Sequence, residues 1–249
     1  MMTMGKTAYL TIDDGPSVDM RAKVDYLAAR RIPAVWFCSG EQLAARPEHA
    51  LYALAHGHVI ANHAYDHPAF SAIELDVCFD QIRRTEDLIA ALYERAGLPF
   101  AGKYFRFPFG DKGGLRRDPF GPYSAEGQAR KAELQAFLRR RGYVQPAFAD
   151  VTYPYLVELG LRDDADWTWT YDCFEWSIFA EDHYDGIDSI DAVFAAMDRD
   201  DPENGFGLHT ASAEVVLMHD HADTASYFAP IVERLVDKGL AFVLPAHDA

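Results

Sequence analysis

The sequence has no run of 18 apolar residues, so no segment has the composition expected of a transmembrane helix. Its first ten residues, MMTMGKTAYL, lack the basic, apolar and small-residue regions of a signal peptide. We therefore expect an unexported, cytoplasmic protein with no membrane partner. Linker-like stretches rich in Gly, Ser or Pro are also missing, so 249 residues of 49% apolar composition predict one domain over residues 1–249.

Cysteine and positive charge are both scarce. Cys38, Cys78 and Cys173 are odd in number and far apart, which argues against a disulfide framework or a thiolate zinc site and predicts three core residues. Lys and Arg number 23 against 39 Asp and Glu, and the net charge of -16 disfavours nucleic acid as a partner. The charge selects no substrate, and the sequence specifies no oligomeric state.

Short apolar runs alternate with helical periodicity along the whole chain. The runs predict buried strands at residues 8–12, 34–38, 58–62, 103–107, 167–171, 215–219 and 241–245. The periodic segments predict helices at 18–31, 42–56, 71–96, 125–141, 189–199 and 224–238. No Gly-rich phosphate loop follows the first strand, so this α/β pattern favours a distorted (β/α) barrel of seven or eight strands. Residues 143–151, which contain Pro146, are a weak candidate for the eighth strand.

Polar clusters begin where five of the predicted strands stop. They read DDG, NHAYDH, RFPFG, YDCFEW and HDH. Since the carboxyl ends of the strands of a β/α barrel meet on one face, these clusters are expected to form a single site.

The first two clusters contain metal-ligating residue types. Asp13 and Asp14 precede a Gly-Pro turn, and on an extended backbone one carboxylate can bind a metal while the other faces the substrate. His63 and His67 are spaced i, i+4, which in a helical turn places both imidazoles on one face. Each pair alone is compatible with ordinary surface residues. Together, one Asp and two His make a catalytic divalent-metal site with open coordination positions.

The third cluster combines a positively charged residue with a turn. Arg106 ends an apolar run, where burial requires a carboxylate partner, either in a structural salt bridge or in one that orients Asp13 or Asp172. Phe109 and Gly110 form a turn whose backbone N–H could face a developing oxyanion.

The last two clusters combine carboxylates, an aromatic ring and a histidine. Asp172, Glu175 and Trp176 suit sugar binding, although Trp176 could be ordinary core. His219 could be a core histidine, but beside a metal and a carboxylate it makes a natural general acid. Asp220 and His221 could indicate an HD-type phosphohydrolase, which is disfavoured because that class carries its further ligands on helices.

In this order the five clusters resemble the motifs of the NodB-homology polysaccharide deacetylases, carbohydrate esterase family 4, over residues 7–245. The resemblance implies that Asp13 is the catalytic base and that the metal ligands are Asp14, His63 and His67. It implies a divalent cofactor, usually Zn²⁺, with Co²⁺, Ni²⁺ or Mn²⁺ as other candidates. The resemblance further implies that Arg106 orients Asp13 and that the backbone N–H of Phe109 stabilises the oxyanion. It implies that His219 is the general acid and that Glu175 tunes it. Leu217 and Trp176 would line the pocket for the acetyl methyl group.

Three features depart from the family pattern. Glu175 stands where the fourth motif usually has Asp, and its extra methylene could alter the contact with His219. Phe109 replaces the usual Tyr of the third motif, which is harmless if only its backbone acts. Residues 111–167 are longer than expected between the third and fourth motifs and predict a substrate-shaping insertion.

The predicted activity is removal of N-acetyl or O-acetyl groups from an amino-sugar poly- or oligosaccharide by metal-activated water. One alternative is a cytoplasmic amidohydrolase of the same superfamily that acts on a small cyclic amide, an imide or a formamide. Another is a carbohydrate-binding protein without catalysis on the same fold. The partner is accordingly an acetylated sugar or a small amide.

Overall fold

A computed structural model describes residues 5–100, 102–114, 123–148, 150–201, 206–208 and 210–246. Its main sheet is parallel, with the strand order β3-β2-β1-β7-β4, and β8 pairs with the start of β1. The bounds are β1 (Lys6–Gly15), β2 (Val35–Cys38), β3 (Val59–Asn62), β4 (Tyr171–Asp172), β7 (Glu214–His219) and β8 (Leu240–Phe242). Residues 8–13 of β1 and residues 35–38 of β2 are buried throughout, as expected for strands covered on both faces. The predicted α/β fold with a parallel sheet is confirmed.

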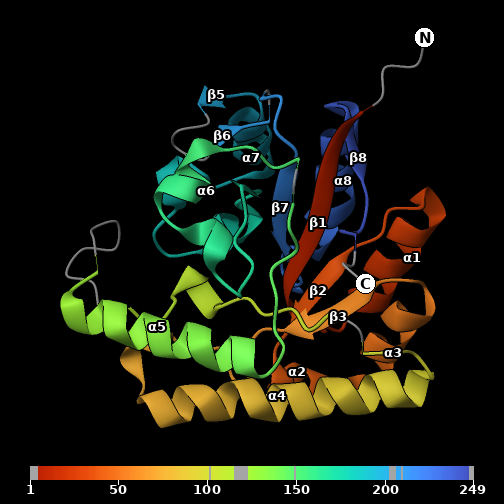
Figure 1. Cartoon of the computed structure of the whole chain (residues 1–249). Helices are drawn as coiled ribbons and strands as arrows, with labels where there is room; N and C mark the ends of the chain where they lie inside the picture. The colour runs from red at the N-terminus through yellow and green to blue at the C-terminus, as the bar shows by residue number, and fades with distance from the viewer. Residues whose placement is uncertain are drawn as a thin grey trace.

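Helices surround this sheet (Figure 1). They are α1 (Met20–Arg30), α2 (Gly40–Ala45), α3 (Pro47–Ala55), α4 (Leu75–Ala96), α5 (Ala125–Arg140), α6 (Pro154–Glu158), α7 (Ile190–Met197) and α8 (Ala225–Asp237). The predicted helix 42–56 is two helices, because Pro47 has no N–H to continue α2 and instead begins α3. A small antiparallel pair, β5 (Asp200–Asp201) and β6 (Phe206–Gly207), lies apart from the main sheet.

The main sheet has six strands among the described residues, fewer than the seven or eight predicted. Residues 103–107 run beside β3 but make only isolated bridges, Asn62 with Phe105 and Lys103 with Tyr143. Single hydrogen bonds continue the path, from Arg106 N to the Asn62 carbonyl (3.1 Å) and from Trp167 N to the Phe105 carbonyl (2.8 Å). The candidate strand 143–151 contributes only the Tyr143 bridge; Pro146 within it cannot donate to a ladder.

Within the predicted insertion, residues 111–167, α5 packs beside α4, whereas α6 lies away from α4 (Figure 1), where its Leu156 packs with Tyr9 and Val215. Phe137 of α5 stacks on Phe79 of α4 at a ring separation of 4.3 Å, and Arg141 pairs with the buried Glu86. Leu134 and Leu138 complete a core cluster with residues of α4 and the 103–107 segment. Residues 115–122 and 149 of this predicted insertion lie outside the described residues.

Cys38, Cys78 and Cys173 are free and buried, which confirms the prediction that they belong to the core. No helix in the described part of the chain combines the length and the apolar character needed to cross a membrane.

Candidate active site

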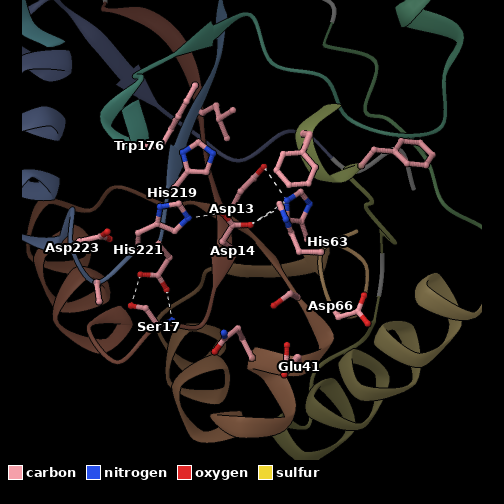
Figure 2. Close-up of a pocket in the computed structure, with 18 of the residues that line it drawn as sticks. Asp13, Asp14, Ser17, Glu41, His63, Asp66, Trp176, His219, His221 and Asp223 are labelled. Atoms are coloured by element: carbon pink, nitrogen blue, oxygen red, sulfur yellow. Dashed lines mark hydrogen bonds and ion pairs between the residues drawn. The ribbon is translucent and has the colours of Figure 1, made fainter. Parts of the chain in front are cut away.

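A cleft of about 910 Å³ opens at the carboxyl ends of the central strands. The residues that line it come from all five polar clusters, as Figure 2 shows for many of them. Of the residues predicted for the site, those on its wall are Asp13, Asp14, His63, His67, Phe109, Asp172, Trp176, Leu217 and His219. Arg106 and Glu175 lie behind this wall and touch it through Asp13 and His219.

Asp13 and Asp14 both face the cleft because β1 is irregular at its end. The pairing of β1 with β2 shifts register between Asp13 and Gly15, and Asp14 has a left-handed backbone (φ 70°). A bulge of this kind re-aims side chains that would otherwise alternate between two faces. The two carboxylates therefore do not point to opposite faces, as a regular extended backbone would place them, and each has its own partners.

His63 and His67 meet through a loop rather than through a helical turn. Residues 63–67 follow β3 without helical structure, and Ala64 (φ 65°) and His67 (φ 58°) are left-handed. Asn62 and Gln81 hold the loop, because their side-chain oxygens accept hydrogen bonds from the N–H of Ala64 and the N–H groups of residues 65 and 66. The two imidazoles end with their ring centres 4.9 Å apart. The predicted proximity is present, but its predicted helical cause is wrong.

Asp14, His63 and His67 form a cluster in which one ligand atom from each residue lies within 4.8 Å of the others. Asp14 Oδ1 is 3.4 Å from His63 Nε2 and 3.0 Å from His67 Nε2, yet it is a buried oxygen with no hydrogen-bond partner. His63 Nδ1 lies 2.8 Å from the Arg106 carbonyl, so it carries the proton and leaves a lone pair on Nε2. An orphaned carboxylate oxygen that faces an imidazole lone pair fits a cation between them.

Charges within and around this cluster shift the pKa values of its members. Burial raises the pKa of Asp14, but the imidazoles of His221, His63 and His67 hold it well below its usual range. Burial lowers the pKa of His63, but the carboxylates of Asp13 and Asp14 outweigh it and raise this pKa.

Arg106 pairs with Asp13 rather than with Asp172. Its Nη1 donates to Asp13 Oδ1 at 2.8 Å, and the guanidinium lies 4.4 Å from the centre of the Phe37 ring. Arg106 is 1% exposed and Asp13 is 3% exposed, so water screens this pair little. The guanidinium thus fixes one oxygen of Asp13 and leaves Oδ2 directed toward the His63 side, 3.6 Å from Nε2.

Glu175 reaches His219 despite its extra methylene. Its Oε1 accepts a hydrogen bond from the His219 backbone N–H and lies 3.2 Å from Nδ1. Burial lowers the pKa of His219, but Glu175, together with Asp14 and Asp172, raises it to about 10. His219 is therefore protonated at neutral pH, with Nε2 left as the nitrogen available to the cleft.

Asp172 and Trp176 are joined to each other at the wall of the cleft. Asp172 accepts hydrogen bonds from the Phe174 N–H (2.8 Å) and from Trp176 Nε1 (3.2 Å). Burial is the main reason that the pKa of Asp172 rises to about 6. Leu217, 3% exposed, adds an apolar side chain to the lining of the cleft.

Phe109 is an exposed ring at the entrance, with 72% of its surface accessible. It packs edge-on against His67 at a centroid distance of 4.5 Å. The turn that presents it requires Gly110 (φ 63°), where a Cβ atom would come within 2.8 Å of Trp169.

Sequence reasoning missed two features of the cleft. Trp169 lines it and stands near the Arg106 guanidinium, with the ring centre 5.6 Å away. His221 Nε2 lies 2.7 Å from Asp14 Oδ2. Its separation of two residues from His219, at the end of a strand, was the available signal, since alternate residues of an extended chain share a face.

The described part of the 111–167 insertion contributes nothing to the lining of the cleft. The contacts of α5 with α4 place this helix outside the cleft, and a substrate-shaping role for the insertion stays a prediction.

Residues 2–118 match the family model described as polysaccharide deacetylase. Over those residues, this chain is similar to the polysaccharide deacetylase family. A segment of 103 residues is 35% identical to a peptidoglycan-N-acetylglucosamine deacetylase of Bacillus cereus and covers 41% of this chain and 36% of that one. A segment of 100 residues is 29% identical to a chitooligosaccharide deacetylase of Rhizobium leguminosarum bv. trifolii and covers 40% of this chain and 46% of that one. The match thus spans less than half of these two relatives.

The solved structures extend the likeness to the rest of the fold. A family 4 carbohydrate esterase from Streptomyces lividans, in complex with acetate, superposes with a TM-score of 0.60 at 22% identity. The match covers 98% of this chain and 100% of that one, so the two chains share a fold beyond residue 118 as well.

Proposed function

We propose that this protein is a metal-dependent hydrolase that removes acetyl groups from an amino-sugar poly- or oligosaccharide. The observation that carries the proposal is the set of contacts around Asp13 and Asp14. One carboxylate is held by a buried guanidinium, and the other presents an unpartnered oxygen to two imidazoles. The similarity to peptidoglycan and chitooligosaccharide deacetylases supports an acetylated sugar as the substrate.

In this proposal Asp14, His63 and His67 hold the divalent cation, most simply Zn²⁺, with Co²⁺, Ni²⁺ or Mn²⁺ as alternatives. One oxygen and two nitrogen ligands are a donor set typical of a catalytic zinc site, with positions left open. The cation supplies a lowered pKa for an attacking water and polarisation of the acetyl carbonyl.

The protein's own residues perform the proton transfers. Asp13 takes the proton of the attacking water, because Arg106 holds it as an oriented carboxylate with Oδ2 free of that contact. His219, which Glu175 keeps protonated, gives a proton to the departing amine. Each such group is typically worth about 10² to 10⁴ in rate. Leu217 and Trp176 provide an apolar surface for the methyl group of the acetyl.

The charge of the cleft favours a neutral sugar over an anionic one. Arg46 is the single Lys or Arg among the described residues that line the cleft. Acidic residues predominate there, namely Asp13, Asp14, Glu41, Asp66, Asp172, Asp220 and Asp223. These carboxylates would repel an anionic substituent on a sugar bound in the cleft, and the repulsion would be stronger at low salt. The volume of about 910 Å³ is at the upper end of the range for small-molecule pockets, which favours an oligosaccharide over a small cyclic amide.

The decisive experiment combines metal analysis with acetate release. Wild-type protein is assayed on N-acetylglucosamine oligomers and on a cyclic imide beside the variants Asp13→Asn and His63→Ala. We expect Asp13→Asn to retain the metal but lose about 10² to 10⁴ in turnover, and His63→Ala to lose both. Acetate release by metal-free wild type would refute the metal-dependent mechanism. Turnover of the imide alone would replace the deacetylase assignment, and bound metal without any hydrolysis would indicate a binding protein.

A further inference from the structure

His221 contacts Asp14 from the side opposite the two cluster histidines. In Figure 2, His221 and His63 lie on opposite sides of Asp14. His221 Nε2 is 2.7 Å from Asp14 Oδ2, whereas His63 and His67 approach Oδ1 at 3.4 and 3.0 Å. His221 is not part of the group whose ligand atoms all lie within 4.8 Å of one another. The two oxygens of Asp14 therefore have separate partners, one on each side.

The backbone of His221 is tied down by a buried ion pair. Lys23 of α1 donates to Asp220 Oδ1 at 2.6 Å and to the His221 carbonyl at 3.2 Å. Asp220 also accepts from the Ser17 N–H and hydroxyl, both at 2.7 Å. Side chains of Lys23 and Asp220 are 4% and 0% exposed. These contacts join the segment after β7 to the turn after β1, so the backbone that carries His221 is held in place relative to Asp14.

Asp14 needs such a partner because its backbone does not fix the torsion of its carboxylate. It occupies the left-handed region (φ 70°), which is unfavourable for a residue with a Cβ atom, in the irregular end of β1. A carboxylate can rotate about its Cβ–Cγ bond, since that torsion is broad. The hydrogen bond to Oδ2 removes this freedom and leaves Oδ1 directed at His63 and His67.

We propose that His221 is a positioning residue for the cation site. Its Nε2–H donates to Asp14 Oδ2 and holds Oδ1 in the orientation that binds the cation with His63 and His67. This inference rests on the proposed function, because it concerns the same site. It adds a residue outside the roles assigned above, and it predicts a specific effect on metal affinity.

The test measures the affinity of the purified protein for Zn²⁺ by competition with a chromophoric chelator. We expect His221→Ala to weaken binding by about 10-fold to 100-fold, the usual effect of removing a group that orients a metal ligand. His221→Gln should recover most of the affinity, because its amide nitrogen can donate from a position close to Nε2. His56→Ala is the matched control, since His56 is exposed and contacts its own helix through the Tyr52 carbonyl.

Absorption spectra of the Co²⁺-loaded variants separate positioning from direct ligation. A positioning role predicts that His221→Gln keeps the wild-type band positions and intensities. A changed coordination spectrum without rescue by Gln would show that His221 is itself a ligand and would overturn the proposal. Zn²⁺ affinity of His221→Ala within twofold of wild type, in a variant with unchanged circular dichroism, would also overturn it. Wild-type protein that binds no Zn²⁺ would instead refute the proposed function.

Discussion

Replacing Glu175 with Gln should change the pH range in which the protein is active. The substitution keeps the size of the side chain and removes the charge next to His219 Nδ1. Without Glu175, burial and the remaining carboxylates compete, and the pKa of His219 falls from about 10 toward its ordinary value of 6.5. A histidine with a pKa of 6.5 is only about 3% protonated at pH 8, so about 30-fold is the upper limit of the rate that a general acid would lose there.

The assay is acetate release from an N-acetylglucosamine oligomer between pH 5 and pH 10, reported as kcat/KM. Asp14 and Asp172 also raise the pKa of His219, so we expect the alkaline limb to move about 2 to 3 pH units lower rather than the full difference. Activity near pH 5.5 should change much less. Glu181→Gln removes an exposed charge on the segment after Glu175 and serves as the control.

Protein stability gives a second, independent measurement of the same pair. A folded pKa of about 10, above the unfolded 6.5, contributes stability that is fully present below pH 6.5 and is lost as the pH rises to about 10. At 1.36 kcal/mol per pH unit this loss is at most about 5 kcal/mol, and most of it should vanish in Glu175→Gln. A uniform fall in activity at every pH, with an unchanged stability profile, would show that Glu175 does not set the charge of His219.

Three further variants test other parts of the structure. The pKa of Asp172, raised to about 6 chiefly by burial, implies that the free energy of unfolding falls as the pH rises from about 4 to 6. Asp172→Asn should remove this fall, which is at most about 3 kcal/mol when measured by urea unfolding. An unchanged dependence of stability on pH in this variant would contradict the assignment. Phe105→Ala deletes a ring that is 0% exposed and should lower the free energy of unfolding by about 3 to 5 kcal/mol in thermal unfolding. A loss below about 1 kcal/mol would mean that neighbouring side chains fill the cavity left by the ring. Phe109→Ala should change stability by less than about 0.5 kcal/mol but raise the KM for oligomers several-fold, unless only the backbone of this residue meets the substrate.

The sequence was informative wherever an element's position follows from its own periodicity. The apolar runs located β1, β2, β3 and β7, and the carboxyl ends of parallel strands necessarily share an edge. That geometry alone brings Asp14, His63 and His219 to one cleft, although Asp14 and His219 are 205 residues apart in the sequence.

Features that depend on tertiary contacts were beyond the reach of periodicity. The left-handed backbone of Asp14 is stabilised by its surroundings, since local propensity disfavours it in a residue other than Gly. The 63–67 loop takes its shape from Asn62 and from Gln81, which lies on α4. Likewise, α5 has the periodicity of a surface helix, but that pattern does not predict whether the helix packs on α4 or beside the cleft.

Arg106 links the two chemical functions of the site through different atoms. Its guanidinium holds Asp13, the residue proposed for proton abstraction, and its backbone carbonyl lies 2.8 Å from His63 Nδ1, which fixes the tautomer of a proposed metal ligand. The aromatic rings of Phe37 and Trp169 lie near the guanidinium of Arg106, so this side chain is buried among groups that hold it in one place. Because the base and the ligand share this one anchor, a displacement of the 103–107 segment would disturb proton transfer and cation binding together. This explains why a segment that supplies only isolated bridges to the sheet nevertheless carries an arginine with 1% exposure.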